Sequence, residues 1–422
     1  MAEKLNKKPV NGMKDVLPRE MQIRQYCMSV IRENYKSYGF TEIETPAMES
    51  IGNLCSKQGG ENEKLIFKVL KRGEKLQIDT AQEENDLADS GLRYDLTLPL
   101  SRYYANHASE LPSPFKALQM GNVWRAERPQ KGRFRQFMQC DIDILGEPTN
   151  LAEIELILAT SSTLKKLGFA NFKVRINDRR MLRAMSDWAG FGEEQFESVC
   201  IILDKMDKIG ADGVKSELLE NGFSAEAVEK YTAFLQGMDA AEDVLGYVKE
   251  TLGDALGEDV SDNLSQIMTS VMAAGQNGYD IAFDPTLVRG MGYYTGTIFE
   301  IEMADFGSSV AGGGRYDKMV GRFTGNDTPA CGFSIGFERI ITILLEQDFQ
   351  IPGEKEKVAF LLEKNLPAQK LADAIAKAQA RRDEGQQVVM VRMNKNKKFQ
   401  KQQLTEEGYT EFVEFYCEEL RR

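Results

Sequence analysis

The sequence predicts an α/β protein of the α+β type, built on an antiparallel sheet that carries a helical insertion and is followed by a small α/β domain. Three observations support this prediction. Residues 134–145 alternate between polar and apolar side chains, residues 147–285 have helical periodicity, and residues 355–422 read as strand, helix, strand, helix and strand. We therefore expect a sheet domain at 1–350, with the insertion at about 180–285, and a C-terminal domain at 355–422.

Composition restricts the function classes. The chain has 422 residues, 42% of them hydrophobic, and a formal net charge of −12, as expected for a globular protein of two or three domains. No apolar run approaches the ~18 residues that span a bilayer, and the N-terminus lacks a signal-peptide core, so we expect a cytoplasmic protein without membrane contact. Six scattered cysteines and a single histidine, His107, argue against a metal site made of Cys or His and against a histidine base.

The N-terminal elements follow from local patterns. Apolar side chains recur at spacings of three and four between residues 23 and 35, which predicts a helix. The segment "TEIETP" predicts a short strand that ends at Pro46. "GNVWRAE" and residues 134–145 predict two paired strands, and the loop "RPQKGR" between them completes a β-hairpin.

The hairpin loop is unusually basic for an acidic chain. The cations in the loop and at the strand ends beside it are Arg125, Arg128, Lys131, Arg133 and Arg135. On the strand that follows, Gln139, Asp141 and Asp143 share one face because strand side chains alternate. A solvated turn is the alternative explanation for a charge run. Cations at the tip and carboxylates on the floor suit a ligand with both phosphates and an amine, such as a nucleotide together with an amino acid.

Two further segments are candidates for ligand contacts. Arg339 lies in the predicted first turn of a helix, "GFERIITILL", where a helix N-terminus and an arginine together favour an anion, although a salt bridge to Glu338 is an equal alternative. In "LVRGMGYYTGTIFE", Arg289 precedes glycines and the pair Tyr293 and Tyr294, which taken alone are more often core residues than ligand contacts. The segment "GGGRYD" lacks the ending of a phosphate-binding P-loop.

Charge is distributed unevenly along the chain. Residues 355–422 contain 14 lysines and arginines against 11 acidic residues, a net charge of +3, so residues 1–354 carry −15. Several cations of the C-terminal segment lie close together in sequence, namely Arg392, Lys395, Lys397, Lys398 and Lys401. They suit contacts with nucleic-acid phosphates, and a solvated helix face is the alternative.

Several long segments resemble the histidyl-tRNA synthetases, a family of class II aminoacyl-tRNA synthetases. "YGFTEIETPAMES", "GNVWRAERPQKGRFRQFMQCDIDILG" and "GFSIGFERI" are similar to motifs 1, 2 and 3 of that class, in this order. "GLRYDLTLPLSRYYA", "LVRGMGYYTGTIFE" and "GGGRYDKMVGRF" resemble segments particular to the family. The resemblance runs from residue 12 to about residue 348, and it implies a class II catalytic domain followed by a short anticodon-binding-like domain.

The resemblance implies roles in ATP chemistry for four residues. Arg125 would hold the ATP α-phosphate and the histidine carboxylate, Glu127 would help to position the nucleotide, and Arg339 would bind the γ-phosphate. Arg289 would lie over the α-phosphate, in place of a metal ion that other class II enzymes use. With Arg125, Arg289 and Arg339 as the catalytic set, the implied cofactors are ATP and Mg²⁺.

The resemblance also implies an amino-acid pocket and an RNA contact. Asp95 and Thr97, with Leu96 between them, would meet the substrate α-amino group, and Gln139 and Asp143 would meet its amine and imidazole. The same pocket would include Arg125 and Arg289, and Tyr293 and Tyr294 would line the imidazole. Gln130 and Arg135 would contact the tRNA acceptor end.

The implied activity is that of a histidine–tRNA ligase, with L-histidine and tRNA(His) as partners and a homodimer formed through residues 39–50. The alternative is a non-catalytic paralogue, the regulatory subunit of ATP phosphoribosyltransferase; Arg125, Arg289 and Arg339 and a C-terminal domain favour the ligase. A general RNA-binding scaffold leaves the pocket residues unexplained. The chain departs from the family pattern at Gly292, where Asp is frequent, and at Met138, where His is frequent.

Overall fold

The computed structural model describes residues 5–55, 61–130, 132–274, 278–289, 292–303, 308–354 and 356–418. Lys131 of the basic loop, and residues 355 and 419–422 of the expected C-terminal domain, lie outside these ranges. Two compact units result from the contacts: residues 1–15 with 27–343, and residues 16–26 with 344–422. The boundaries at 350 and 355 stay a prediction.

The strands of the described residues are β1 (Thr41–Glu42), β2 (Met48–Ser50), β3 (Lys68–Leu70), β4 (Ala88–Leu92), β5 (Phe115–Trp124), β6 (Gln136–Leu145), β7 (Phe172–Asp178), β8 (Tyr279–Phe283), β9 (Thr297–Met303), β10 (Ser308–Arg315), β11 (Ala330–Ile335), β12 (Lys357–Leu362), β13 (Gln387–Arg392) and β14 (Tyr409–Phe415).

The helices are α1 (Pro18–Ser37), α2 (Ile51–Leu54), α3 (Glu84–Leu87), α4 (Thr97–His107), α5 (Leu151–Lys166), α6 (Arg179–Ala189), α7 (Phe196–Leu203), α8 (Met206–Glu220), α9 (Ala225–Ala240), α10 (Val244–Leu252), α11 (Glu258–Ala274), α12 (Lys318–Thr324), α13 (Phe337–Glu346), α14 (Ala368–Asp383) and α15 (Lys397–Glu406). Short 3₁₀ turns occur at Glu61–Leu65, Gly73–Lys75, Ile78–Thr80, Glu193–Gln195 and Gly253–Ala255.

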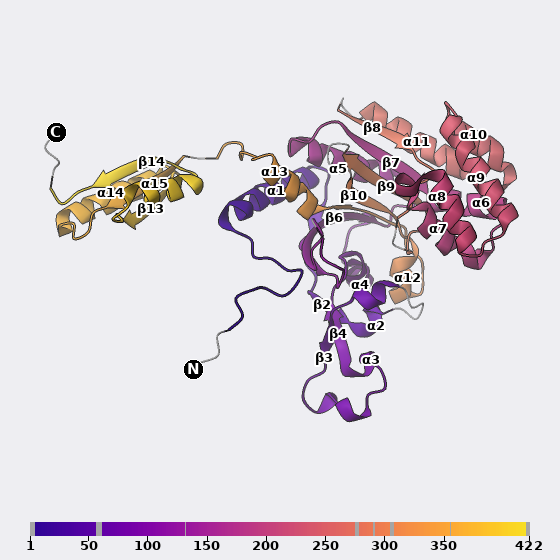
Figure 1. The fold of residues 1–422 in the computed structure, drawn as a ribbon, viewed down its shortest axis with the longest axis horizontal. Helices are drawn as coiled ribbons and strands as arrows, with labels where there is room; N and C mark the ends of the chain where they lie inside the picture. The colour runs from indigo at the N-terminus through magenta and orange to yellow at the C-terminus, as the bar shows by residue number, and fades with distance from the viewer. Residues whose placement is uncertain are drawn as a thin grey trace. The chain divides into compact units, whose positions relative to one another are not determined.

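A large, mainly antiparallel sheet organises the first unit (Figure 1). Its strand order is β1-β5-β6-β11-β10-β9-β7-β8, and only the outer pairs β1–β5 and β7–β8 are parallel. The predicted hairpin is confirmed, since β5 and β6 pair along their full length from Phe115–Leu145 to Trp124–Gln136. Cys140, Ile142 and Ile144 of β6 are fully buried because their apolar side chains face the core of the unit. A smaller sheet, β2-β4-β3, belongs to the same unit.

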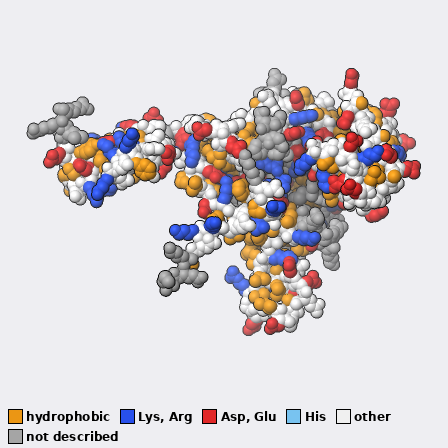
Figure 2. Space-filling model, viewed as in Figure 1, with side chains coloured by type: hydrophobic (Ala, Val, Ile, Leu, Met, Phe, Trp, Pro, Cys, Tyr) orange, Lys and Arg blue, Asp and Glu red, His pale blue; other side chains and the backbone are white. Residues whose placement is uncertain are grey.

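Helices α6 to α11 lie between β7 and β8 in the chain, so that two parallel neighbours of the main sheet bracket the helical segment. Helix α11 packs on α5, β7 and β8, and α8 packs on α7 and α9. Acidic side chains are scattered over this helical region, at the right of Figure 2. Helix α8 contains a break at Gly210, whose φ of 67° and ψ of 177° are not helical.

The second unit contains a three-stranded parallel sheet, with β12 between β13 and β14. Val358 and Phe360 pack with Ala378 of α14, whereas Ala359 and Leu361 pack with Leu404 of α15. Because successive strand residues face opposite sides, one helix covers each face of this sheet. The strand–helix order expected for the C-terminal segment is therefore confirmed. None of the described helices is long and apolar enough to cross a membrane.

Candidate active site

One face of the main sheet carries a row of polar side chains. Gln139, Asp141 and Asp143 of β6 point to the same side, as their spacing of two predicts. On the neighbouring strand β11, Gly332 pairs with Asp143 and Ser334 pairs with Asp141. The amide of Gln139 donates to the hydroxyl of Ser334 at 3.3 Å, so these side chains form a connected polar floor.

Buried carboxylates give this floor its chemistry. Asp143 is only 3% exposed, and burial raises its pKa to about 7, while a hydrogen bond from Tyr316 acts in the opposite direction. Burial, and then the charge of Asp143, raise the pKa of Asp141 well above its ordinary value. Burial also raises the pKa of Asp95. The site therefore holds carboxyl groups that gain from a cationic or hydrogen-bond-donating ligand.

Unpaired polar atoms gather on the same floor. Among the described residues, Oε1 of Gln139, Oδ1 of Asp141 and Nε of Arg289 are buried without a hydrogen-bond partner. Two acceptors and one donor left in this state cost free energy unless a ligand satisfies them. The arrangement favours a ligand that carries both a donor, such as an amine or ring N–H, and an acceptor, such as a carboxylate or phosphate oxygen.

Aromatic rings form one wall above Asp143. The rings of Tyr293 and Tyr294 lie 4.8 Å apart between centroids, and Tyr293 meets Tyr316 edge-on at 6.0 Å. The hydroxyl of Tyr316 donates to Oδ1 of Asp143 at 2.6 Å. No role for Tyr316 follows from the sequence alone, although the segment "GGGRYD" that contains it is the signal that could have pointed to it.

Asp95, Leu96 and Thr97 form the start of α4 next to this wall. Oδ1 of Asp95 accepts a hydrogen bond from the backbone N–H of Leu98 at 3.2 Å, so this carboxylate also caps the helix. The side chain of Leu96 is buried, and its carbonyl accepts from the amide of Gln119 at 3.2 Å. The side chain of Thr97 interacts with Tyr293. Leu96 thus contributes backbone position, whereas its neighbours contribute polar side chains.

Arg289 lies across the glycines of β10. Its Nη1 donates to Glu300 of β9 at 2.5 Å. A Cβ atom on Gly312 would overlap the guanidinium of Arg289, so only glycine at this position lets the arginine approach the sheet. With Nε of Arg289 unpaired, the guanidinium has a free donor over the floor.

Aromatic rings and a backbone carbonyl hold Arg125 among the residues that the structure describes. Its guanidinium carbon lies 4.2 Å from the ring centre of Tyr94 and 5.1 Å from that of Phe137. Nε of Arg125 donates to the carbonyl of Tyr94 at 3.1 Å. This geometry fixes the plane of the guanidinium and leaves its positive charge for an anion.

Arg339 occupies the first turn of α13, as predicted. It donates to the carbonyl of Ser309, while the carboxylate of Glu338 accepts from the backbone N–H of Met138 at 3.2 Å. Burial lowers the pKa of Arg339, and the charges of Arg133 and Arg289 lower it further. The charge of Glu300 acts in the opposite direction and raises it. Cations that destabilise one another in this way favour a polyanionic ligand.

The hairpin loop packs against the N-terminal segment. Nε of Arg135 donates to the carbonyl of Glu127 at 3.0 Å, and the backbone N–H of Arg135 donates to the carbonyl of Gly12 at 2.8 Å. Glu127 is half-buried, and Gln130 is exposed and pairs with Arg133 in an isolated bridge. The side chain of Arg135 therefore shapes the loop, and its contact with RNA stays a prediction.

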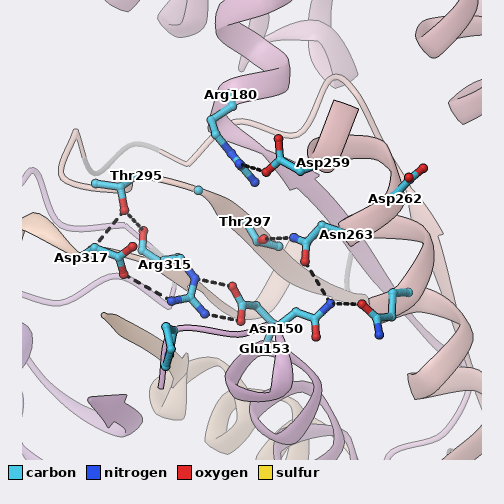
Figure 3. Close-up of a pocket in the computed structure, with 13 residues that line it drawn as sticks. Asn150, Glu153, Arg180, Asp259, Asp262, Asn263, Thr295, Thr297, Arg315 and Asp317 are labelled. Atoms are coloured by element: carbon cyan, nitrogen blue, oxygen red, sulfur yellow. Dashed lines mark hydrogen bonds and ion pairs between the residues drawn. The ribbon is translucent and has the colours of Figure 1, made fainter. Parts of the chain in front are cut away.

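A separate cavity of about 630 Å³ lies on the opposite face of the main sheet (Figure 3). Thr297 and Arg315 line it, and alternation along β9 and β10 turns both away from the Asp143 face. Its charged lining residues all have an opposite charge nearby; they are Glu153, Arg180, Asp259, Asp262, Arg315 and Asp317. Since each of these charges is in an ion pair, this cavity differs from the Asp143 face, where buried polar atoms are left unpaired.

Comparisons with known proteins point to one family. Residues 12–340 match the family model described as histidyl-tRNA synthetase. The chain belongs to the histidyl-tRNA synthetase family. A histidine–tRNA ligase of Leifsonia xyli subsp. xyli is 47% identical over 351 residues, 80% of each chain. One of Porphyromonas gingivalis is 37% identical over 355 residues, which covers 82% of this chain and 77% of that one.

Solved structures show the same fold. A histidyl-tRNA synthetase from Nostoc sp. PCC 7120 superposes with a TM-score of 0.75 at 28% identity, over 96% of this chain and 90% of that one. A protein from Bacillus halodurans C described as an ATP phosphoribosyltransferase regulatory subunit/histidyl-tRNA synthetase has the same TM-score at 20% identity, over 98% and 99% of the two chains. The second likeness concerns the fold alone. The class II fold expected from the sequence is confirmed.

Proposed function

We propose that the protein is a histidine–tRNA ligase, which activates L-histidine with ATP to histidyl-adenylate and transfers the histidyl group to tRNA(His). The main support for this proposal is one sheet face that combines buried carboxylates, an aromatic wall and three arginines. Family membership supports this assignment. The proposal places the protein in the cytoplasm as a homodimer through residues 39–50.

The carboxylate side of the floor is the proposed histidine pocket. Asp95 and Thr97 accept hydrogen bonds from the α-ammonium group, and Gln139 and Asp143 contact the amine and the imidazole. Tyr293 and Tyr294 bound the ring, and we add Tyr316 because its hydroxyl fixes the Asp143 carboxylate at 2.6 Å. The unpaired oxygens of Gln139 and Asp141 support this placement, since histidine brings N–H donors.

The arginine side is the proposed ATP site. Arg125 orients the histidine carboxylate and the α-phosphate, Arg289 lies over the α-phosphate, Arg339 binds the γ-phosphate, and Glu127 positions the nucleotide. The carboxylate oxygen of histidine attacks the α-phosphorus, a P–O bond forms, and the bond to the departing pyrophosphate breaks. The attacking carboxylate is already ionised, so no protein base is required, and positioning and charge stabilisation lower the barrier.

Mg²⁺ fits this site as an ion bound to ATP. It prefers oxygen ligands and usually combines substrate phosphates with one or two carboxylates. Glu127, a half-buried carboxylate two residues after Arg125, is the residue that we propose to meet it. When bound, the ion would neutralise phosphate charge. The residues of the hairpin would position the nucleotide around it, and Gln130 and Arg135 would meet the acceptor end of the tRNA.

Aminoacylation tests the proposal. Purified protein, ATP, Mg²⁺ and labelled histidine should charge a tRNA(His) transcript, and the Arg289→Ala variant should not. No charging by the wild-type protein, together with stimulation of an ATP phosphoribosyltransferase, would assign the protein to the regulatory class instead.

A further inference from the structure

An ion-pair network links the helical insertion to Arg289. At its centre is Arg175 of β7, which is 8% exposed. Nη1 of Arg175 lies 2.9 Å from the carboxylate of Asp207 in the first turn of α8, and Nε lies 2.5 Å from that of Asp284, just after β8. Burial opposes the charge of Arg175, but these carboxylates raise its pKa above the ordinary value.

Glu300 is shared between two arginines. It pairs with Nη1 of Arg289 at 2.5 Å, and its other oxygen lies 4.0 Å from Nη1 of Arg175. Arg175 and Glu300 are direct cross-strand neighbours in the β7–β9 pair, so little movement separates the loose contact from a close one. At present Asp207, at 2.9 Å, holds Nη1 of Arg175 more closely than Glu302 at 3.8 Å or Glu300 at 4.0 Å.

Asp284 ties the same network to the chain that leads into Arg289. Its Oδ1 accepts from the backbone N–H and the hydroxyl of Thr286, at 2.9 and 2.7 Å. Nδ2 of Asn177 donates to the carbonyl of Leu287 at 3.0 Å. Arg175 therefore touches the turn before Arg289 through Asp284, and the partner of Arg289 through Glu300.

On the side of the helical insertion, the network ends in the first turn of α8, which can shift independently of the rest of that helix. The side chain of Asp207 is 64% exposed, and the break in α8 at Gly210 separates its turn from the rest of that helix. A small cleft of about 50 Å³ lies beside this turn, and Arg175, Asp204, Asp207 and Glu300 are among the residues that line it. A shift of the first turn of α8 would change the distance between Asp207 and Arg175 directly.

We propose that Asp207 is a positioning residue for Arg289. By holding Arg175 on the insertion side, Asp207 leaves Glu300 to orient the Arg289 guanidinium over Gly312. The helical insertion thus sets the position of an arginine that acts on the α-phosphate, a role that rests on the proposed ligase function. Without the Asp207 charge, Arg175 moves toward the two carboxylates of β9, Glu302 and Glu300, and competes with Arg289 for Glu300.

Pyrophosphate-exchange kinetics of Asp207→Asn measure this effect. We expect kcat to fall roughly three- to tenfold, with KM for ATP nearly unchanged, because Arg289 acts on the reacting phosphate more than on nucleotide affinity. Asp207→Glu should restore most of the rate. Asp212→Asn is the matched control, since Asp212 is an exposed aspartate on the same helix and should behave as wild type.

A double-mutant cycle with Glu300→Gln shows whether Asp207 acts through Glu300. In the Glu300→Gln background, Asp207→Asn should cause no further loss. The proposal would be overturned if the loss in kcat of the double variant equalled the product of the two single losses. It would also be overturned if Asp207→Asn and Asp212→Asn had equal effects.

The same cycle measured by thermal unfolding needs no activity. Non-additive shifts in Tm support the network, and additive shifts overturn it. Absence of exchange in the wild-type protein would count against the proposed ligase function alone.

Discussion

At the residue scale, the site contains carboxyl groups whose burial away from water costs free energy. Asp95, Asp141 and Asp143 are all buried, and burial is the first cause of each raised pKa. Such groups destabilise the ligand-free protein in proportion to the displacement of the pKa. A ligand amine or ring N–H would offset that cost, which is how function explains an arrangement that stability alone would disfavour.

Asp143→Asn should stabilise the protein at alkaline pH. The pKa of about 7 in the folded state lies above the ordinary value of 3.8, so the stabilising contribution of the protonated form is present below about pH 4 and lost as the pH rises through 7. The variant should therefore unfold with a free energy roughly 1–4 kcal/mol higher than wild type at pH 8, and with a smaller gain at pH 5. Denaturant titrations at both pH values measure this, with Asp212→Asn as the control; a gain that does not grow with pH contradicts it.

Asp143→Ala should weaken the use of histidine far more than the use of ATP. Loss of a charge-assisted contact in a buried site costs about 1.5–3 kcal/mol, which corresponds to roughly a ten- to hundredfold loss in kcat/KM for histidine. Exchange kinetics with either substrate varied give both constants. Unchanged constants for histidine would remove Asp143 from the pocket.

The charged residues of the site could be predicted from the sequence more easily than the residues that position them. Gln139, Asp141 and Asp143 could be placed on one face because strand alternation is a local rule. Tyr316 could not be joined to Asp143, since 173 residues separate them and only the β10–β11–β6 register brings them together. The ring of Tyr94 that contacts Arg125 was missed for the same reason, because Tyr94 lies outside the hairpin.

At the element scale, glycines on β10 allow side chains to lie flat against the sheet. Gly312→Ala should leave the fold intact, because the atom that clashes with the new Cβ is the end of the flexible Arg289 side chain. Displaced from the sheet, Arg289 would lose its orientation, and exchange activity should fall at least about a hundredfold. Circular dichroism and exchange assays decide this. Gly52→Ala, where the nearest atom lies 4.0 Å away, is the control, and equal activities of the two variants would contradict the prediction.

Some elements could be predicted and others could not. The β5–β6 hairpin followed from alternation and a loop with Pro129 and Gly132, and the C-terminal strands and helices followed from their periods. The parallel pairs β1–β5 and β7–β8 join segments far apart in sequence, and no local pattern fixes such pairing. The short sheet β2-β4-β3 was also missed, since its strands of three to five residues are too short for a reliable period.

The basic residues of α15 are less available than their sequence suggests. Lys397 and Lys401 pair with Glu414 of β14, at 2.7 and 2.5 Å. Phosphate contacts through these lysines would have to break both pairs. Glu414→Gln should therefore strengthen tRNA binding, by roughly two- to fivefold at low salt, and steepen its salt dependence. Filter binding across a salt series checks this; a weaker or unchanged affinity would exclude α15 as an RNA surface.

At the scale of the whole molecule, the second unit includes the start of α1 as well as the C-terminal segment. Arg19 pairs with Glu354 at 3.1 Å, and the ring of Tyr26 lies 5.7 Å from that of Phe349. A chain that ends at Glu356 keeps these partners, whereas one that ends at Glu346 loses them. We expect both to form the adenylate and to charge tRNA poorly, and the longer one to have the higher Tm. Full charging by either would show that the C-terminal segment does not contact tRNA.

Histidine-dependent exchange of pyrophosphate into ATP tests the central claim most directly, because it requires the carboxylate floor and the three arginines to act on one pair of substrates. With each standard amino acid in turn, the purified protein should catalyse exchange with histidine and with no other, and Arg125→Ala, Arg289→Ala and Arg339→Ala should each abolish it. Exchange that is absent with histidine, or equally strong with another amino acid, would contradict the assignment of this face as a histidine-activating site.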